Sequence, residues 1–242
     1  MQVPDSKIIV AVDSPVDTLA RRLVSQLDPK LCRLKIGSVL FTHYGPALIE
    51  VFMKQGFSIF LDLKFHDIPQ TVAGACRSAA ALGVWMLNVH AQGGCSMIEA
   101  ARNELEKVPK NQRPLLVAVT VLTSLDQSDL LAMGWQDSVE SLVLRLALLA
   151  EKSGADGVVC SAHEACALRS ATKKSFLLVT PGIRLSSGFA HDQKRVMTPR
   201  EAIAAGANYL VIGRAITEAK DPLKQLELIS AELHESRYCA DS

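Results

Sequence analysis

The chain contains 242 residues, 49% of them hydrophobic, and its 26 basic and 25 acidic side chains leave a formal net charge of +1. This composition supports a large buried core and excludes an intrinsically disordered chain. The balanced charge also argues against a nucleic-acid-binding protein, so an anionic ligand would need a local binding site.

The N-terminal segment MQVPDSKIIVAVD lacks the basic and then apolar pattern of a secretion signal. The longest apolar run, LLVAVTVL at 115–122, is too short to cross a membrane. The six cysteines include no CxxC pair, which is typical of a reduced protein. We therefore expect a cytoplasmic protein with no membrane or nucleic-acid partner.

Eight short runs are almost continuously apolar and rich in β-branched residues, which predicts buried parallel strands. In chain order they cover residues 7–13, 31–37, 58–65, 85–91, 115–122, 157–161, 176–183 and 209–215.

The segments between these runs have apolar residues at helical spacing. They predict helices at 15–27, 44–55, 68–82, 96–107, 138–152, 163–172, 199–205 and 222–235. Four of these segments are followed by a glycine, the residue preferred just after a helix: Gly56, Gly83, Gly154 and Gly206.

This alternation predicts the α/β class, with a single (β/α)8 TIM barrel forming one domain over residues 1–242. The alternative is an open, doubly wound sheet. Such a sheet would usually carry a glycine-rich turn after its first strand, whereas the first strand here runs into VDSP at 12–15.

Polar residues interrupt or follow the apolar runs at their carboxyl ends, where barrel enzymes have their active sites. They are Asp13, Lys35, Asp62, Lys64, His66, Asp67, His90, Thr123, Ser124, Arg184 and Arg214, with Gly213 directly before the last of them. Any one of them could be a solvated strand end, but the whole set fits a single barrel mouth better.

The segment FLDLKFHDIPQT at 60–71 is the most informative of these. Asp62 and Lys64 are two residues apart, so on a strand they face the same side and can pair. With Asp67 nearby, these carboxylates would keep Lys64 protonated, and a fixed ammonium suits proton donation to a carbanion. The alternative is an ion pair that only braces the barrel.

A second group of residues predicts a phosphate site. Barrels often bind phosphate with the loops after strands seven and eight, and the seventh loop here is long, at 181–195. Gly213 permits close backbone approach, Arg214 offers a bidentate fork, and Gln193 could add a neutral donor. A disordered insertion is the alternative for the loop.

Cys160, His163 and Cys166 are spaced by three residues and could share a helix face around zinc. However, Cys160 belongs to an apolar, strand-like run, and no fourth ligand is evident. We therefore expect core cysteines and a loop histidine, with no metal site.

These residues together resemble the orotidine 5′-phosphate decarboxylase family over essentially the whole chain. The similarity lies in AVD at 11–13, LKIG at 34–37, DLKFHDIP at 62–69, NVHA at 88–91, VTVLTS at 119–124, TPGIR at 180–184 and VIGRAI at 211–216. A related sugar-phosphate group shares the DxKxxD core, but not the full set in this order.

The resemblance implies a cofactor-free decarboxylation of orotidine 5′-phosphate to UMP in pyrimidine synthesis, with Lys64 protonating the ring carbon. It implies a catalytic array of Lys35, Asp62, Lys64 and Asp67, and a homodimer in which Asp67 and Thr71 enter the partner's site. Asp13 and Lys35 would hold the ribose, and Thr123 would face the base. Four residues would lie at the phosphate: Gln193, Gly213, Arg214 and Arg184. His90 also matches a position of the family, but the sequence does not predict its role.

Three other functions remain as alternatives: a magnesium-dependent sugar-phosphate decarboxylase or aldolase, a barrel isomerase, and a silent phosphate-binding protein. Full activity after chelation would argue against the first. A pH–rate profile with a distinct acid and base would favour the second. Binding of UMP without turnover would favour the third.

Overall fold

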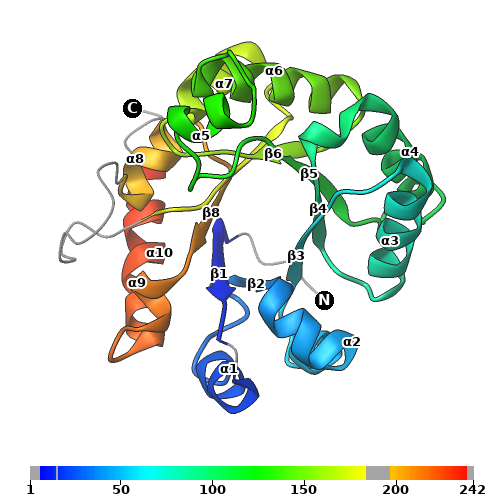
Figure 1. Cartoon of the computed structure of the whole chain (residues 1–242). Helices are drawn as coiled ribbons and strands as arrows, with labels where there is room; N and C mark the ends of the chain where they lie inside the picture. Colours follow the sequence, from blue (N-terminus) through cyan, green and yellow to red (C-terminus); the bar gives the residue numbers. More distant parts are fainter. Residues whose placement is uncertain (1–5, 15, 184–196, 239–242) are drawn as a thin grey trace.

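The computed structural model describes residues 6–14, 16–183 and 197–238. Arg184 and Gln193, two of the predicted phosphate residues, lie outside these described residues. Eight parallel strands close into a barrel in sequence order, with β8 pairing back to β1 (Figure 1). The predicted (β/α)8 barrel is therefore confirmed, and the open sheet is excluded.

All eight predicted strands are present, each inside or equal to its predicted run. They are β1 (Ile8–Val12), β2 (Arg33–Gly37), β3 (Ile59–Phe65), β4 (Met86–His90), β5 (Leu115–Val119), β6 (Gly157–Val159), β7 (Leu177–Thr180) and β8 (Tyr209–Ile212). Several strands end before the apolar run does. β7 stops before Pro181, which has no N–H for the ladder, and β8 stops at Gly213, where a short helix begins.

Helices surround the barrel (Figure 1). They are α1 (Asp17–Val24), α2 (Ser38–Lys54), α3 (Pro69–Ala81), the 3-10 turn η1 (Ala91–Gly93), α4 (Gly94–Glu106), α5 (Gln127–Ala132), α6 (Val139–Lys152), α7 (Ala165–Ala171), α8 (Pro199–Ala204), α9 (Arg214–Thr217) and α10 (Pro222–Tyr238).

Two helical features differ from the sequence prediction. The second helix starts at Ser38 and not at residue 44. It is kinked at Gly45, which has a positive φ of 59° and is followed by Pro46. The short helices α5 and α9 were not predicted, because six and four residues are too few to display helical periodicity. The four predicted glycines after helices are confirmed, with φ between 79° and 107°.

The core forms two layers because strand residues alternate between the helices and the barrel interior. The larger layer packs between strands and helices. The interior layer is apolar and consists of Ile9, Ala11, Phe60, Met86, Val117, Val179 and Val211. At the amino ends of the strands, the guanidinium of Arg33 stacks on Trp85, 4.3 Å from the ring centroid, and closes the barrel there.

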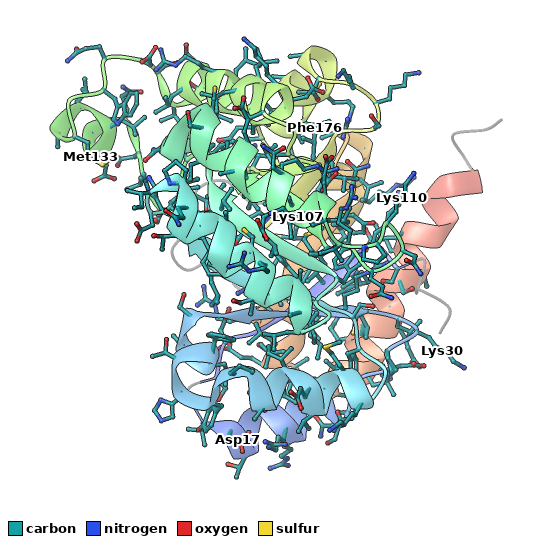
Figure 2. The ribbon with its side chains drawn as sticks, turned by 90° about the vertical axis from the view of Figure 1, so that its right-hand side faces the viewer. Asp17, Lys30, Lys107, Lys110, Met133 and Phe176 are labelled. Carbon is teal, nitrogen blue, oxygen red and sulfur yellow. The ribbon has the colours of Figure 1, made fainter. Side chains whose placement is uncertain are left out.

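Figure 2 shows the barrel from the side, so that its two ends can be told apart. Lys30 and Lys110, which precede β2 and β5, lie toward one end, and Met133, which follows β5, lies at the opposite end (Figure 2). The charged residues that end the strands therefore share the second end, which we call the mouth.

Gly157 allows β6 to approach β7 closely. A Cβ added at this residue would overlap the backbone carbonyl oxygen of Leu177, and a backbone atom cannot move aside without breaking the parallel ladder. We expect Gly157→Ala to lower Tm by at least about 3 °C, the consequence of overpacking a barrel of this size. Thermal unfolding followed by circular dichroism measures this, and an unchanged Tm would contradict the close-approach interpretation.

Candidate active site

Three neighbouring strands bring four charged side chains to one part of the mouth. Lys35 on β2 pairs in register with Ala11 on β1, two residues before Asp13. Gly37, two residues further along β2, pairs with Asp62 on β3. Because parallel strands in register end at the same level, residues distant in sequence meet here.

The four side chains form a chain of alternating charge. Lys35 Nζ lies 3.0 Å from Asp13 Oδ1 and 3.1 Å from Asp62 Oδ2. Lys64 Nζ lies 2.7 Å from the other carboxylate oxygen of Asp62. The ion pair predicted between Asp62 and Lys64 is therefore present, and Lys35 extends it to Asp13.

Burial is greatest at the centre of this chain. The side chains of Lys35 and Asp62 are 11% and 10% exposed, whereas that of Lys64 is 36% exposed and that of Asp13 is 58% exposed. The central pair is thus shielded from water, while both outer groups reach the open mouth. Buried charges of this kind persist only when they are paired.

The pairing keeps both central groups ionised. Burial alone would favour the neutral acid of Asp62, but the charges of Lys35 and Lys64 outweigh it and hold its pKa below the usual range. Burial also opposes the charge on Lys35, but Asp62 and Asp13 raise the pKa of its ammonium above the ordinary value. Both groups therefore stay charged across the neutral pH range.

Gly37 makes room for this array. A Cβ at Gly37 would lie 3.2 Å from Asp13 Oδ1 and 3.3 Å from Lys35 Nζ. In the sequence this glycine is only the last residue of the LKIG motif, because nothing in a single sequence reveals what lies beside it.

Asn88 is a buried site residue whose role the sequence did not predict. It lies on β4 and is fully buried. Its side chain contacts both Asp62 and the backbone of Lys64. One signal could have identified it: Asn88 is a polar residue inside an apolar run, two positions from Met86 in the barrel interior.

Asp67 and Thr71 are not part of the array in this chain. Both are exposed, and Asp67 Oδ1 accepts a hydrogen bond from the neighbouring N–H of Ile68 at 2.6 Å. Among the described residues Asp67 makes no ion pair. The predicted contact between Asp67 and Lys64 is therefore not made within this chain.

The other predicted ligand residues that the structure describes lie on segments that follow strands at the mouth. Thr123 is exposed after β5, and Arg214 is exposed at the start of α9, directly after β8. Gly213 precedes Arg214 and lies beside β1, where an added Cβ would be 3.7 Å from Ala11.

His90 ends β4 beside His66, with ring centroids 5.4 Å apart. Burial, and then the nearby His66 and Lys64, lowers the pKa of His90 below its ordinary value. The imidazole is therefore neutral at neutral pH, and it adds no positive charge beside Lys64.

The zinc alternative finds no support in the part of the chain that the structure describes. No group of three or more histidine, cysteine, aspartate or glutamate side chains there could hold a metal ion. Cys160 is buried as predicted, but Cys166 is exposed on α7, so the expectation that both are core residues is wrong for Cys166.

No described helix is long and apolar enough to cross a bilayer.

In chemical terms, the mouth offers a fixed, partly open ammonium beside a buried carboxylate that cannot move away. An ammonium held in this way can stabilise negative charge that develops in a ligand and can give it a proton.

Comparison with known proteins covers almost the whole chain. An orotidine 5′-phosphate decarboxylase from Coxiella burnetii is 57% identical over 233 residues, which are 96% of this chain and 99% of that protein. One from Nitrosococcus oceani is 58% identical over 228 residues, which are 94% of this chain and 97% of that protein.

Solved structures agree with the sequence comparison. The crystal structure of orotidine 5′-phosphate decarboxylase from Lactobacillus acidophilus superposes with a TM-score of 0.83 at 37% identity, covering 96% of this chain and 99% of that chain. Residues 6–229 match the sequence model described as the orotidine 5′-phosphate decarboxylase / HUMPS family. On these matches and on the barrel that carries the charged array, the chain belongs to the orotidine 5′-phosphate decarboxylase / HUMPS family.

Proposed function

We propose that Lys64 is the proton donor in the decarboxylation of orotidine 5′-phosphate to UMP. The chain is an orotidine 5′-phosphate decarboxylase by family and by its close, full-length relatives. The observation that carries the role of Lys64 is its ion pair with Asp62 at 2.7 Å, at the carboxyl end of the barrel.

The proposed reaction breaks the bond between the pyrimidine ring and its carboxylate. Carbon dioxide leaves, and the bonding electron pair stays on the ring carbon. A proton then passes from Lys64 Nζ to that carbon, and the neutral amine regains a proton from solvent. The ring delocalises this charge poorly, so a preorganised ammonium supplies the stabilisation.

Asp62 has two parts in this proposal. It holds Lys64 in position, and its own negative charge, maintained by Lys35, stabilises the ammonium electrostatically. It would also lie near the departing carboxylate of the substrate.

The other predicted residues would bind the nucleotide away from the reacting carbon. Asp13 and Lys35 would hold the ribose, Thr123 would face the base, and Gly213 and Arg214 would bind the phosphate. Arg184 and Gln193 would join them from the seventh loop. Remote contacts of this kind can contribute to the rate by fixing the substrate and expelling water.

We infer further that the enzyme is a homodimer with shared active sites. Asp67 and Thr71 are exposed near the mouth, and Ile68 between them is 66% exposed. A large apolar side chain in this position suits burial against a second subunit. Asp67 of the partner subunit would then complete the charged array.

Cytoplasmic localisation stays a prediction from the sequence.

Lys64→Ala should lower kcat at least about 10³-fold while changing the Kd of UMP less than about tenfold, because proton donation acts in the transition state. Lys64→Arg is the matched variant, since arginine keeps the charge but does not release its proton. Both should be inactive when the ultraviolet absorbance of the substrate is followed with chelator-treated protein.

Substantial activity in Lys64→Ala would reject the assigned role. Activity in Lys64→Arg alone would mean that positive charge matters and proton donation does not.

Subunit mixing tests the shared site. Lys64→Ala and Asp67→Ala dimers should each be inactive, but their heterodimers contain one site with both residues intact. An equimolar, fully exchanged mixture should therefore regain about one quarter of wild-type activity.

The control mixes Lys64→Ala with Asp62→Ala, whose residues pair within one chain. This mixture should regain nothing. If the first mixture also stays inactive despite verified exchange, Asp67 acts within its own subunit or not at all.

A further inference from the structure

The segment of β3 that carries Lys64 departs from regular strand geometry. Leu61 pairs with Leu87 of β4, but the next pair is Phe65 with Val89. Three residues of β3, Asp62 to Lys64, therefore lie opposite Asn88 alone. This irregularity is a bulge, a feature that redirects side chains and leaves ladder groups unpaired.

Lys64 has an unusual backbone conformation inside the bulge. Its φ is 51°, and no other non-glycine residue in the described segments has a positive φ. This left-handed conformation is costly for a residue with a Cβ. It persists only where neighbouring groups hold it in place.

Asn88 supplies the groups that hold the bulge. Its Oδ1 accepts a hydrogen bond from the backbone N–H of Lys64 at 2.8 Å. Its Nδ2 donates to Asp62 Oδ1 at 2.6 Å, the same oxygen that receives Lys64 Nζ. One side chain thus fixes both the backbone of the lysine and the carboxylate that pairs with its ammonium.

The chemistry of these contacts requires a carboxamide. One end must accept from an N–H and the other must donate to a carboxylate, which fixes the orientation of the amide. A carboxylate of the same size would place a second negative charge against Asp62. Alanine would leave the N–H of Lys64 without its partner in a partly buried position.

We propose that Asn88 is a positioning residue for the reaction, which sets the direction of the Lys64 ammonium by clamping the β3 bulge. This inference rests on the proposed role of Lys64. Without Asn88, the left-handed conformation loses its support and the ammonium moves from its place in the mouth. A displacement of about 1 Å at a reacting group is enough to cost about 10²-fold in rate.

Asn208 provides a matched control at the opposite end of the barrel, just before β8. Its Oδ1 also accepts from a backbone N–H, that of Leu178 at 2.8 Å, and from the guanidinium of Arg169 at 2.7 Å. Asn208→Ala therefore removes comparable hydrogen bonds without touching the mouth.

We expect Asn88→Ala to lower kcat about 10²-fold while KM changes less than about threefold, because binding contacts remain and lysine geometry is lost. Asn208→Ala should lower Tm without a comparable loss of kcat. The exchange rate of the Lys64 backbone amide hydrogen reports whether its hydrogen bond to Asn88 is present. This rate should be higher than in the wild type for Asn88→Ala and unchanged for Asn208→Ala.

Asn88→Asp tests the same contact by pH and keeps the size of the side chain. When protonated, the introduced carboxyl group can accept from the Lys64 N–H and donate to Asp62, as the amide does. When ionised, it repels Asp62, and burial with this repulsion raises its pKa. The ratio of its kcat to that of the wild type should therefore rise from about pH 8 to about pH 5.

Three results would overturn the proposal: unchanged kcat in Asn88→Ala, equal loss of kcat in Asn88→Ala and Asn208→Ala, or loss through KM alone. If Asn88→Ala does not fold, a flat activity ratio for Asn88→Asp across the pH range would overturn it. A failure of the proposed function is separate, because it would appear as activity in Lys64→Ala, whereas amide exchange at Lys64 reports the clamp whatever the chemistry.

Discussion

The structure of the mouth depends on one carboxylate, Asp62, shared by two ammonium groups. One oxygen of Asp62 lies 3.1 Å from Lys35 Nζ and the other lies 2.7 Å from Lys64 Nζ. Burying Lys35 or Asp62 alone would cost several kcal/mol, so each of these two residues is tolerated only because it is paired. Removing Asp62 would leave two cations facing each other, whereas removing one lysine would leave the second pair intact. The array is therefore least tolerant of change at its centre.

The barrel fold makes this arrangement possible because it holds the ends of β1, β2 and β3 at one level. Below the charges, the barrel interior is filled by the apolar side chains of the interior layer, which include Ile9 and Val211. At the far end, the guanidinium of Arg33 packs on Trp85 and Tyr209 and closes the barrel. Water has little access to the array from that side. The electrostatic interactions are consequently stronger than the same pairs would be at a surface, and a ligand that seals the mouth would strengthen them further.

The sequence predicted the barrel because buried parallel strands are apolar along their whole length and are separated by amphipathic helices. It also predicted the pairing of Asp62 with Lys64, but on the assumption of regular alternation. In the structure the pair forms in another way, because Lys64 lies in a bulge and has a φ of 51°. The spacing of two residues does not by itself bring the ammonium of Lys64 to the carboxylate of Asp62. A bulge leaves no clear trace in a single sequence, and neither does the residue that supports it. Asn88 acts on Asp62 and Lys64 of β3, and Gly37 lies beside Asp13, which follows β1, so their roles needed the register of the sheet.

The difference in exposure between the two lysines suits different tasks. Lys35, only 11% exposed and bracketed by Asp13 and Asp62, has a raised pKa and holds its proton firmly. Lys64 has 36% of its side chain exposed and a single carboxylate partner in its own chain, so its ammonium is accessible to solvent. The donor role proposed for Lys64 requires an ammonium that is held rigidly enough to point at the reacting carbon and that still recovers a proton after each turnover. A fully buried lysine would meet the first need and fail the second, whereas a surface lysine would do the reverse. Clamping the backbone of Lys64 through Asn88 fixes the direction of the side chain without enclosing the ammonium, which reconciles the two requirements.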